Sequence, residues 1–241
     1  MIPWSVSGFK ATRSTKSHET LVLWRGINLQ QSLVSQAPKT RIGILISGRG
    51  SNMRALADAV DEGRISNAEI ALVVSDKPHA PGIAHAARRG LKTQVIERRG
   101  RSREEHDRET VAALRDNGVD LICLAGYMRL LSAYFIDAFR HRILNIHPSL
   151  LPAFPGLDAH GQALAAGVQT SGCTVHFVDE TLDGGPIIAQ RTVPVLPGDT
   201  EELLQARILA EEHQLYPEAV ELVVSGKIAV VGSSVLRKNQ S

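Results

Sequence analysis

The chain contains 241 residues, 43% of them hydrophobic and 22% charged, which suits one large globular domain, alone or with a tail. Its 27 basic and 25 acidic side chains leave a formal net charge of +2, too small an excess for a dedicated nucleic-acid binder. No apolar run approaches the roughly 18–20 residues that a membrane-spanning helix needs. We therefore expect small-molecule partners, and neither nucleic acid nor a membrane.

The first forty residues differ in composition from the rest. They are rich in Ser, Thr, Lys, Arg and Gln, and Glu19 is their only acidic residue. An organelle transit peptide, a mis-called start codon and a disordered tail all give this bias. We favour a disordered extension over residues 1–40 and a single domain over residues 41–241. Cys123 and Cys173 form no CxxC pair, which argues against a disulfide framework and for a reducing, cytoplasmic location.

From Arg41 onward, short β-branched runs alternate with amphipathic stretches, the pattern of parallel βαβ units. The predicted strands span residues 42–46, 70–75, 93–96, 121–124 and 143–146. The predicted helices span residues 53–62, 83–89, 103–117 and 132–139. This order predicts an α/β fold with an open, mostly parallel, Rossmann-like sheet flanked by helices.

The pattern changes after Pro152. Extended segments at 174–178 and 187–195 flank an Asp-Gly-Gly-Pro turn, which predicts a late antiparallel strand pair. Asp199, with Glu202 three residues later, resembles a capping box that opens a long C-terminal helix through about residue 224. We expect Pro217 to break that helix and a last strand to span residues 228–231.

A glycine loop follows the first predicted strand. Residues 47–52, Ser-Gly-Arg-Gly-Ser-Asn, open a helix, so backbone N–H groups including those of Met53 and Arg54 can converge on an anion. The loop lacks the Lys-Ser or Lys-Thr of a nucleoside triphosphate loop, and its GxGxx run ends on Met53 where the dinucleotide motif has glycine. The short loop suits a monophosphate better than a nicotinamide cofactor whose ribose would contact Asp76. A tight turn with no ligand would have the same sequence pattern.

The most informative stretch ends the fifth predicted strand. Asn145 and His147 lie two residues apart and therefore share one face, while Pro148 prevents continuation as a helix. An amide and an imidazole together offer two donors to the oxyanion that develops on a carbonyl, and histidine can also transfer a proton. Ligands of open α/β sheets bind at this carboxyl edge.

Asp183, in a Leu-Asp-Gly-Gly-Pro turn, is the carboxylate that we would pair with His147. Such a pair favours the charged imidazolium. No serine or cysteine nucleophile is evident, so direct attack by a substrate amine is the more natural chemistry. Each residue alone could instead be structural, with His147 bonded to a carbonyl and Asp183 capping its own turn.

Together these motifs resemble the folate-dependent formyltransferase family. The matching segments run in order from about Ile42 to Val231: residues 47–52, the Ala-Gly-Tyr-Met-Arg-Leu-Leu of 125–131, residues 145–152, residues 175–178 and residues 182–186. The Ser-Gly-x-Gly-Ser-Asn loop resembles the glycinamide ribonucleotide branch of this family. The resemblance implies transfer of the formyl group of N10-formyltetrahydrofolate, a co-substrate, to the amine of 5-phosphoribosylglycinamide in purine biosynthesis, without a metal and by a monomer or homodimer.

The resemblance also implies residue roles. It makes Asn145, His147 and Asp183 the catalytic trio. It implies a ribonucleotide site made of Gly50, Ser51, Asn52, Met53, Arg54, Leu209, Ala210, Glu211 and Glu212. It implies a folate site made of Arg103, Met128, Arg129, Leu130, Leu131, Asn145, Asp179, Glu180, Thr181, Leu182 and Asp183. Gly161 stands where many family members have a basic residue, and the apolar Leu209 is expected to make only backbone contact. We expect His176 to be structural or to support the catalytic residues without contacting the substrate.

Three alternatives remain at this point. Formyltetrahydrofolate hydrolase and methionyl-tRNA formyltransferase share the chemistry, but each typically carries an additional domain for which this chain leaves little room. A non-catalytic module that binds folate or sugar phosphate has no need of Asn145, His147 and Asp183 together. The sequence therefore favours the glycinamide ribonucleotide branch of the formyltransferase family.

Overall fold

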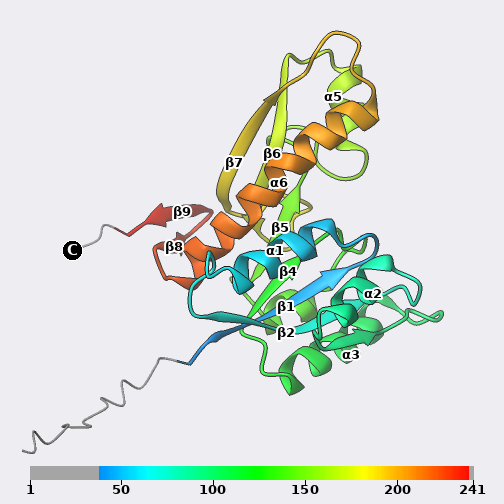
Figure 1. Cartoon of the computed structure of the whole chain (residues 1–241), viewed down its shortest axis with the longest axis vertical. Helices are drawn as coiled ribbons and strands as arrows, with labels where there is room; N and C mark the ends of the chain where they lie inside the picture. The colour runs from blue at the N-terminus through cyan, green and yellow to red at the C-terminus, as the bar shows by residue number, and fades with distance from the viewer. Residues whose placement is uncertain (1–37, 239–241) are drawn as a thin grey trace, which may run out of the picture. The chain divides into compact units, whose positions relative to one another are not determined.

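The structure is a computed structural model that describes residues 38–238. Almost all of the predicted extension over residues 1–40 lies outside the described residues. A seven-stranded sheet with the order β3-β2-β1-β4-β5-β6-β7 forms the centre (Figure 1). Its strands are β1 (Thr40–Ile46), β2 (Ala68–Ser75), β3 (Thr93–Val95), β4 (Leu121–Leu124), β5 (Ile143–His147), β6 (Thr170–Phe177) and β7 (Ile187–Pro194). The first five pair in parallel, whereas β6 and β7 are antiparallel, as the sequence predicts.

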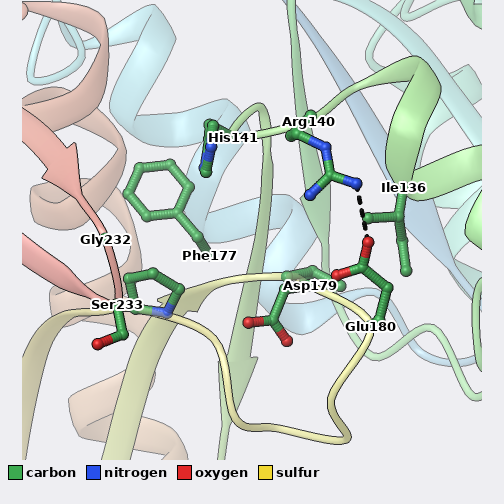
Figure 2. Close-up of a pocket in the computed structure, with 10 residues that line it drawn as sticks. Ile136, Arg140, His141, Phe177, Asp179, Glu180, Gly232 and Ser233 are labelled. Carbon is green, nitrogen blue, oxygen red and sulfur yellow. Dashed lines mark hydrogen bonds and ion pairs between the residues drawn. The ribbon is translucent and has the colours of Figure 1, made fainter.

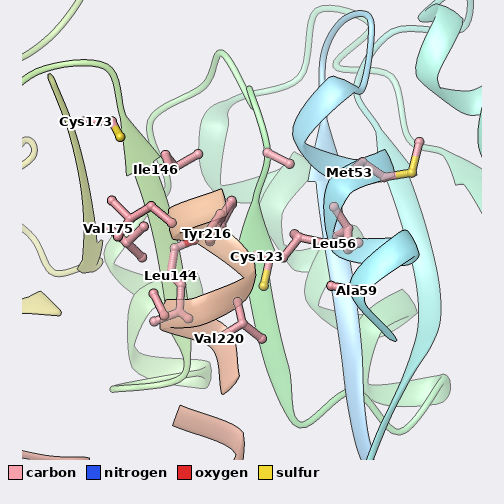
Figure 3. Packing of buried hydrophobic residues seen from close by; sticks show 14 of the residues in the cluster. Met53, Leu56, Ala59, Cys123, Leu144, Ile146, Cys173, Val175, Tyr216 and Val220 are labelled. Atoms are coloured by element: carbon pink, nitrogen blue, oxygen red, sulfur yellow. Dashed lines mark hydrogen bonds between the residues drawn. The ribbon is translucent and has the colours of Figure 1, made fainter. Parts of the chain in front are cut away.

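Helices cover both faces of the sheet because side chains alternate along each strand. Ile44 and Ile46 belong to one buried cluster, and Leu45 between them belongs to another on the opposite face. The helices are α1 (Ser51–Asp61), α2 (Pro81–Arg88), α3 (Arg103–Asp116), α4 (Ala133–Ala138), α5 (Ala159–Ala165) and α6 (Glu201–Val224). Side chains of α1 and α6 fill the first cluster (Figure 3), and those of α3 and α4 fill the second.

The prediction that Pro217 breaks the last helix is wrong. α6 continues through Pro217, although proline removes one helical hydrogen bond. Pro217 and its neighbours Tyr216 and Val220 are buried, and the Tyr216 hydroxyl lies 3.1 Å from the carbonyl oxygen of Leu124 and 3.0 Å from that of Leu144. These tertiary contacts hold the helix against β4 and β5.

The capping prediction is also wrong by one residue. Thr200, not Asp199, is the N-cap of α6, and its side chain accepts a hydrogen bond from the Leu203 amide. The Asp199 carboxylate instead binds Arg207 and the Leu196 amide, and these bonds lower its pKa to about 2. An aspartate beside a threonine offers two capping side chains, and only the fold selects one.

Two elements were not predicted. The helix α5 lies between β5 and β6, and the strand β9 (Ser234–Arg237) pairs with the predicted last strand, β8 (Ile228–Val231), as a separate hairpin. The strand β6 also begins four residues before the predicted segment, at Thr170. Within residues 38–238, no helix is long and apolar enough to cross a membrane, and no group of three or more His, Cys, Asp or Glu residues could hold a metal ion.

Candidate active site

The glycine loop lies between β1 and α1, as the sequence predicts. Gly50 is the N-cap of α1 with a left-handed φ of 74°, and a Cβ there would lie 2.9 Å from the Cα of Gly82. Glycine is therefore required for both conformation and space. No side chain caps α1, so the N–H groups of its first turn remain available to an anion.

Glu212 on α6 lies beside this loop. The Asn52 amide donates a hydrogen bond to Oε2 of Glu212 at 2.7 Å, and both side chains are buried. Burial raises the pKa of Glu212 to about 7, while the Asn52 hydrogen bond opposes the rise. Asn52 Oδ1 and His213 Nε2 are buried without a hydrogen-bond partner among the described residues. The structure thus brings two of the predicted ribonucleotide residues together and leaves polar atoms beside them for a ligand.

The remaining predicted residues on α6 differ in placement. Leu209 is half-buried and Ala210 is exposed. Glu211 points to Arg191, with Oε2 3.0 Å from a guanidinium nitrogen. The side-chain hydrogen bond from this helical segment to the glycine loop is made by Glu212.

The strand β5 carries Asn145 and His147 at the point where the sheet changes direction. It pairs in parallel with β4 and antiparallel with β6, so Asn145 has Leu124 on one side and His176 on the other. His147 is buried, and its Nε2 lies 2.9 Å from the Phe154 carbonyl oxygen. Its Nδ1 lies 3.4 Å from Oδ2 of Asp183. The structure therefore brings the predicted pair of His147 and Asp183 together.

Local backbone geometry fixes the Asp183 carboxylate. Asp183 has a left-handed φ of 49°, and its Oδ2 accepts a hydrogen bond from the Gly156 amide at 2.8 Å. A Cβ on Gly185 would lie 2.0 Å from the Phe177 carbonyl oxygen, so only glycine lets the turn close against β6. The Leu-Asp-Gly-Gly-Pro turn thus holds a carboxylate next to the imidazole.

His176 contacts a candidate catalytic residue, in line with the second of the two roles expected for it. Its Nδ1 lies 2.8 Å from the Phe177 carbonyl oxygen, so Nδ1 carries the proton and Nε2 can accept one. Nε2 lies 3.3 Å from the Asn145 amide nitrogen and 3.8 Å from Oδ1 of Asp183. Burial lowers the pKa of His176 and favours this neutral form. The neutral ring therefore orients the Asn145 amide.

Apart from Asn145 on β5, the predicted folate residues come from two partly exposed segments and from α3. Met128 and Leu130 follow β4, Leu182 precedes the Asp-Gly-Gly turn, and each of these apolar side chains is more than half exposed. Such side chains at a sheet edge suit an apolar ligand. The Ser132 amide donates a hydrogen bond to Oδ2 of Asp107 at 2.6 Å. This bond connects the segment after β4 to α3, whose first residue is Arg103.

A cavity of about 260 Å³ is lined in part by the segment that carries Asp179 and Glu180 (Figure 2). Its lining includes Phe177, the turn of the β8–β9 hairpin, and Arg140, which lies 2.8 Å from Glu180. None of Asn145, His147 and Asp183 lines it. The Arg140–Glu180 pair therefore lies at a cavity that the candidate catalytic residues do not line.

The structure gives a local reason for Gly161. Asp158 is the N-cap of α5, and its Oδ1 accepts a hydrogen bond from the Gly161 amide at 3.2 Å. A Cβ on residue 161 would lie 2.5 Å from Asp158 Oδ2. A larger residue here would displace the capping carboxylate.

Comparisons with known proteins agree with this geometry. A model of the formyl transferase family matches residues 40–220. Phosphoribosylglycinamide formyltransferase of Escherichia coli strain K12 is 42% identical over 188 residues, which cover 78% of this chain and 88% of that protein. The trifunctional purine biosynthetic protein adenosine-3 of Drosophila pseudoobscura pseudoobscura is 49% identical over 200 residues, which cover 82% of this chain and 15% of that longer protein.

The fold gives the same result. The crystal structure of glycinamide ribonucleotide transformylase 1 from Symbiobacterium toebii aligns with a TM-score of 0.82 at 50% sequence identity, over 83% of this chain and 95% of that chain. The sequence motifs, the sheet order and these matches lead to one conclusion. The chain belongs to the formyl transferase family.

Proposed function

We propose that this chain transfers the formyl group of N10-formyltetrahydrofolate to the amine of 5-phosphoribosylglycinamide in purine biosynthesis. The observation that carries the proposal is the contact between His147 and Asp183 on the face that also presents Asn145. The names of the bacterial relatives support this choice of substrates. The proposal includes a cytoplasmic location and a monomer or homodimer.

The reaction needs no covalent enzyme intermediate. The substrate amine attacks the formyl carbon, a C–N bond forms, and the carbonyl oxygen becomes an oxyanion. The Asn145 amide, oriented by His176, donates one hydrogen bond to that oxygen, and His147 supplies the second donor. The bond from the formyl carbon to N10 of the folate then breaks.

His147 also moves the proton. Its Nε2 is bonded to the Phe154 carbonyl, which fixes the ring and leaves Nδ1, on the Asp183 side, as the nitrogen for proton transfer. His147 enters the reaction as the imidazolium, so the Nδ1–H that donates to the oxyanion is present from the start. This proton passes to N10 as the folate leaves, and the proton lost by the attacking amine returns to Nδ1, so the charge balances. Asp183 stabilises the imidazolium before and after these steps.

Binding is divided between the two sides of the site. The ribonucleotide phosphate would lie on the uncapped N-terminus of α1, with Asn52 and Glu212 beside the rest of that substrate. The folate would lie between Met128, Leu130 and Leu182, whose apolar surfaces are exposed.

The test is to mix the protein with formyl folate, with and without the ribonucleotide, and to follow release of deformylated folate by absorbance. Release only with the ribonucleotide supports the transferase. Release without it supports the hydrolase, and release under neither condition supports a binding module. The His147→Ala variant should bind both ligands yet transfer little formyl, and undiminished turnover would contradict the role of His147.

A further inference from the structure

Ser47 joins the two candidate binding segments. It directly follows β1, at the start of the glycine loop, and its side chain is buried. Its amide donates to the Gly126 carbonyl oxygen at 3.0 Å, and its hydroxyl accepts a hydrogen bond from the Met128 amide at 2.9 Å. One residue thus makes two bonds to the segment that begins the candidate folate site.

Asp76 orients the Ser47 hydroxyl. The hydroxyl donates its single proton to Oδ1 of Asp76 at 2.6 Å. Because that proton is engaged, a lone pair faces the Met128 amide. Removal of the hydroxyl would leave the Met128 N–H without its acceptor in a partly buried position.

These contacts lie at the point where the order of the sheet reverses. β1 lies between β2 and β4, and the chain runs outward from it in both directions. Asp76 follows β2, Ser47 follows β1, and Met128 lies just beyond the end of β4. The Gly48 carbonyl oxygen also accepts a hydrogen bond from the Gly82 amide at 3.1 Å, so the glycine loop is bonded to α2 as well.

We propose that Ser47 is a positioning residue that holds the segment from Met128 to Leu131 in place against the glycine loop, and so sets the folate relative to the ribonucleotide. This inference rests on the proposed function, because it assumes that the two segments bind those two substrates. Ser47 acts through the backbone of Met128. Its hydroxyl is engaged by Asp76 and Met128.

The experiment measures steady-state formyl transfer by the Ser47→Ala variant. We expect the KM for formyl folate to rise about ten-fold, which corresponds to about 1.4 kcal/mol, because the Met128 amide loses its acceptor. The KM for the ribonucleotide should change less than about two-fold, because the glycine loop keeps its backbone bonds. A merely structural role would not separate the two KM values.

Ser75→Ala is a matched control. Ser75 ends β2, is fully buried, and its hydroxyl likewise accepts one bond, from the Lys77 amide at 3.0 Å, and donates another, to the Lys77 carbonyl at 2.9 Å. It contacts neither candidate binding segment through these bonds. Ser75→Ala should lower the thermal midpoint about as much as Ser47→Ala and leave both KM values unchanged.

Two variants of Asp76 test the hydrogen bond if Ser47→Ala does not fold. Asp76→Asn keeps an acceptor oxygen for the hydroxyl and should behave as the wild type, whereas Asp76→Ala should raise the folate KM. If Asp76→Asn and Asp76→Ala raise the folate KM equally, loss of the Asp76 charge explains the change, and the proposal is overturned.

The two proposals fail in different ways. Wild-type protein that transfers no formyl group would overturn the proposed function. Active wild-type protein together with a folded Ser47→Ala variant whose folate KM is unchanged would overturn the role of Ser47 alone.

Discussion

The Asn52 amide donates a hydrogen bond to Oε2 of Glu212 across a separation of 160 residues in the chain. This bond joins the glycine loop to α6. Burial of the carboxyl group raises the pKa of Glu212 to about 7, above the ordinary value of 4.5, and the bond from Asn52 opposes the rise. The folded state therefore favours the protonated form. Stability from this group is fully present below pH 4.5 and is lost as the pH rises through about 7.

Glu212→Gln should remove this pH dependence. Between pH 4.5 and 7 the free energy of unfolding of the wild type should fall, relative to that of the variant, by about 3 kcal/mol. Denaturant unfolding at several pH values measures the difference. Glu211→Gln, on the same helix but paired with the half-buried Arg191, is the control and should show a much smaller change. A pH-independent difference between wild type and Glu212→Gln would contradict the prediction.

Asp183→Asn should lower kcat about 100-fold, because the imidazolium of His147 loses its counter-charge. Asparagine tolerates the left-handed φ of Asp183, so the thermal midpoint should change little. Steady-state kinetics and a thermal melt measure the two quantities. Asp137→Asn, which removes a carboxylate paired with Arg140, should keep wild-type kcat. Full activity of Asp183→Asn would disprove the role of the charge.

His176→Leu should lower kcat about ten-fold, because the Asn145 amide loses the acceptor that orients it. Binding of formyl folate, measured by isothermal titration, should change less than kcat. His106→Leu is a matched control, since His106 is also buried and its Nε2 lies 2.7 Å from the Ile96 carbonyl oxygen. If both variants lose kcat equally, the effect reflects stability and not the orientation of Asn145.

Tyr216→Phe should destabilise the protein by about 1 kcal/mol, because the carbonyl oxygens of Leu124 and Leu144 lose a buried donor. Both KM values should stay unchanged, since Tyr216 packs behind β4 and β5 (Figure 3). Tyr134→Phe, whose ring lies under the Arg108 guanidinium, is the control and should cost less. Denaturant unfolding tests the comparison, and equal losses would exclude a specific role for the Tyr216 hydroxyl.

Local patterns predicted the parts of the site that depend on local geometry. Residues two apart on a strand share a face, so Asn145 and His147 could be placed together from the sequence. The glycine loop between β1 and α1 could also be predicted from local sequence. Gly50 adopts a left-handed φ that other residues avoid, so a glycine between a strand and a helix indicates a tight turn. These features need no knowledge of the neighbouring strands.

Contacts between segments far apart in the chain could not be predicted from local sequence patterns. The role of His176 depends on the register that sets it opposite Asn145, and a shift of one residue would point its ring to the other face. The burial of Glu212 depends on where α6 packs. The predicted break at Pro217 is wrong because it considered local preference alone. Packing of the buried neighbours of Pro217 outweighs the local preference against proline in a helix.

The mixed pairing of β5 has a consequence for the order of folding. His147 lies on β5, His176 lies on β6, and Asp183 lies on the turn after β6, so this half of the site is closed by shorter loops than the other half. The Asn52–Glu212 bond closes a loop of 160 residues, which carries a larger entropic cost and forms only when most of the chain is in place. The catalytic half can therefore assemble first, and ribonucleotide affinity should be the last property gained in refolding.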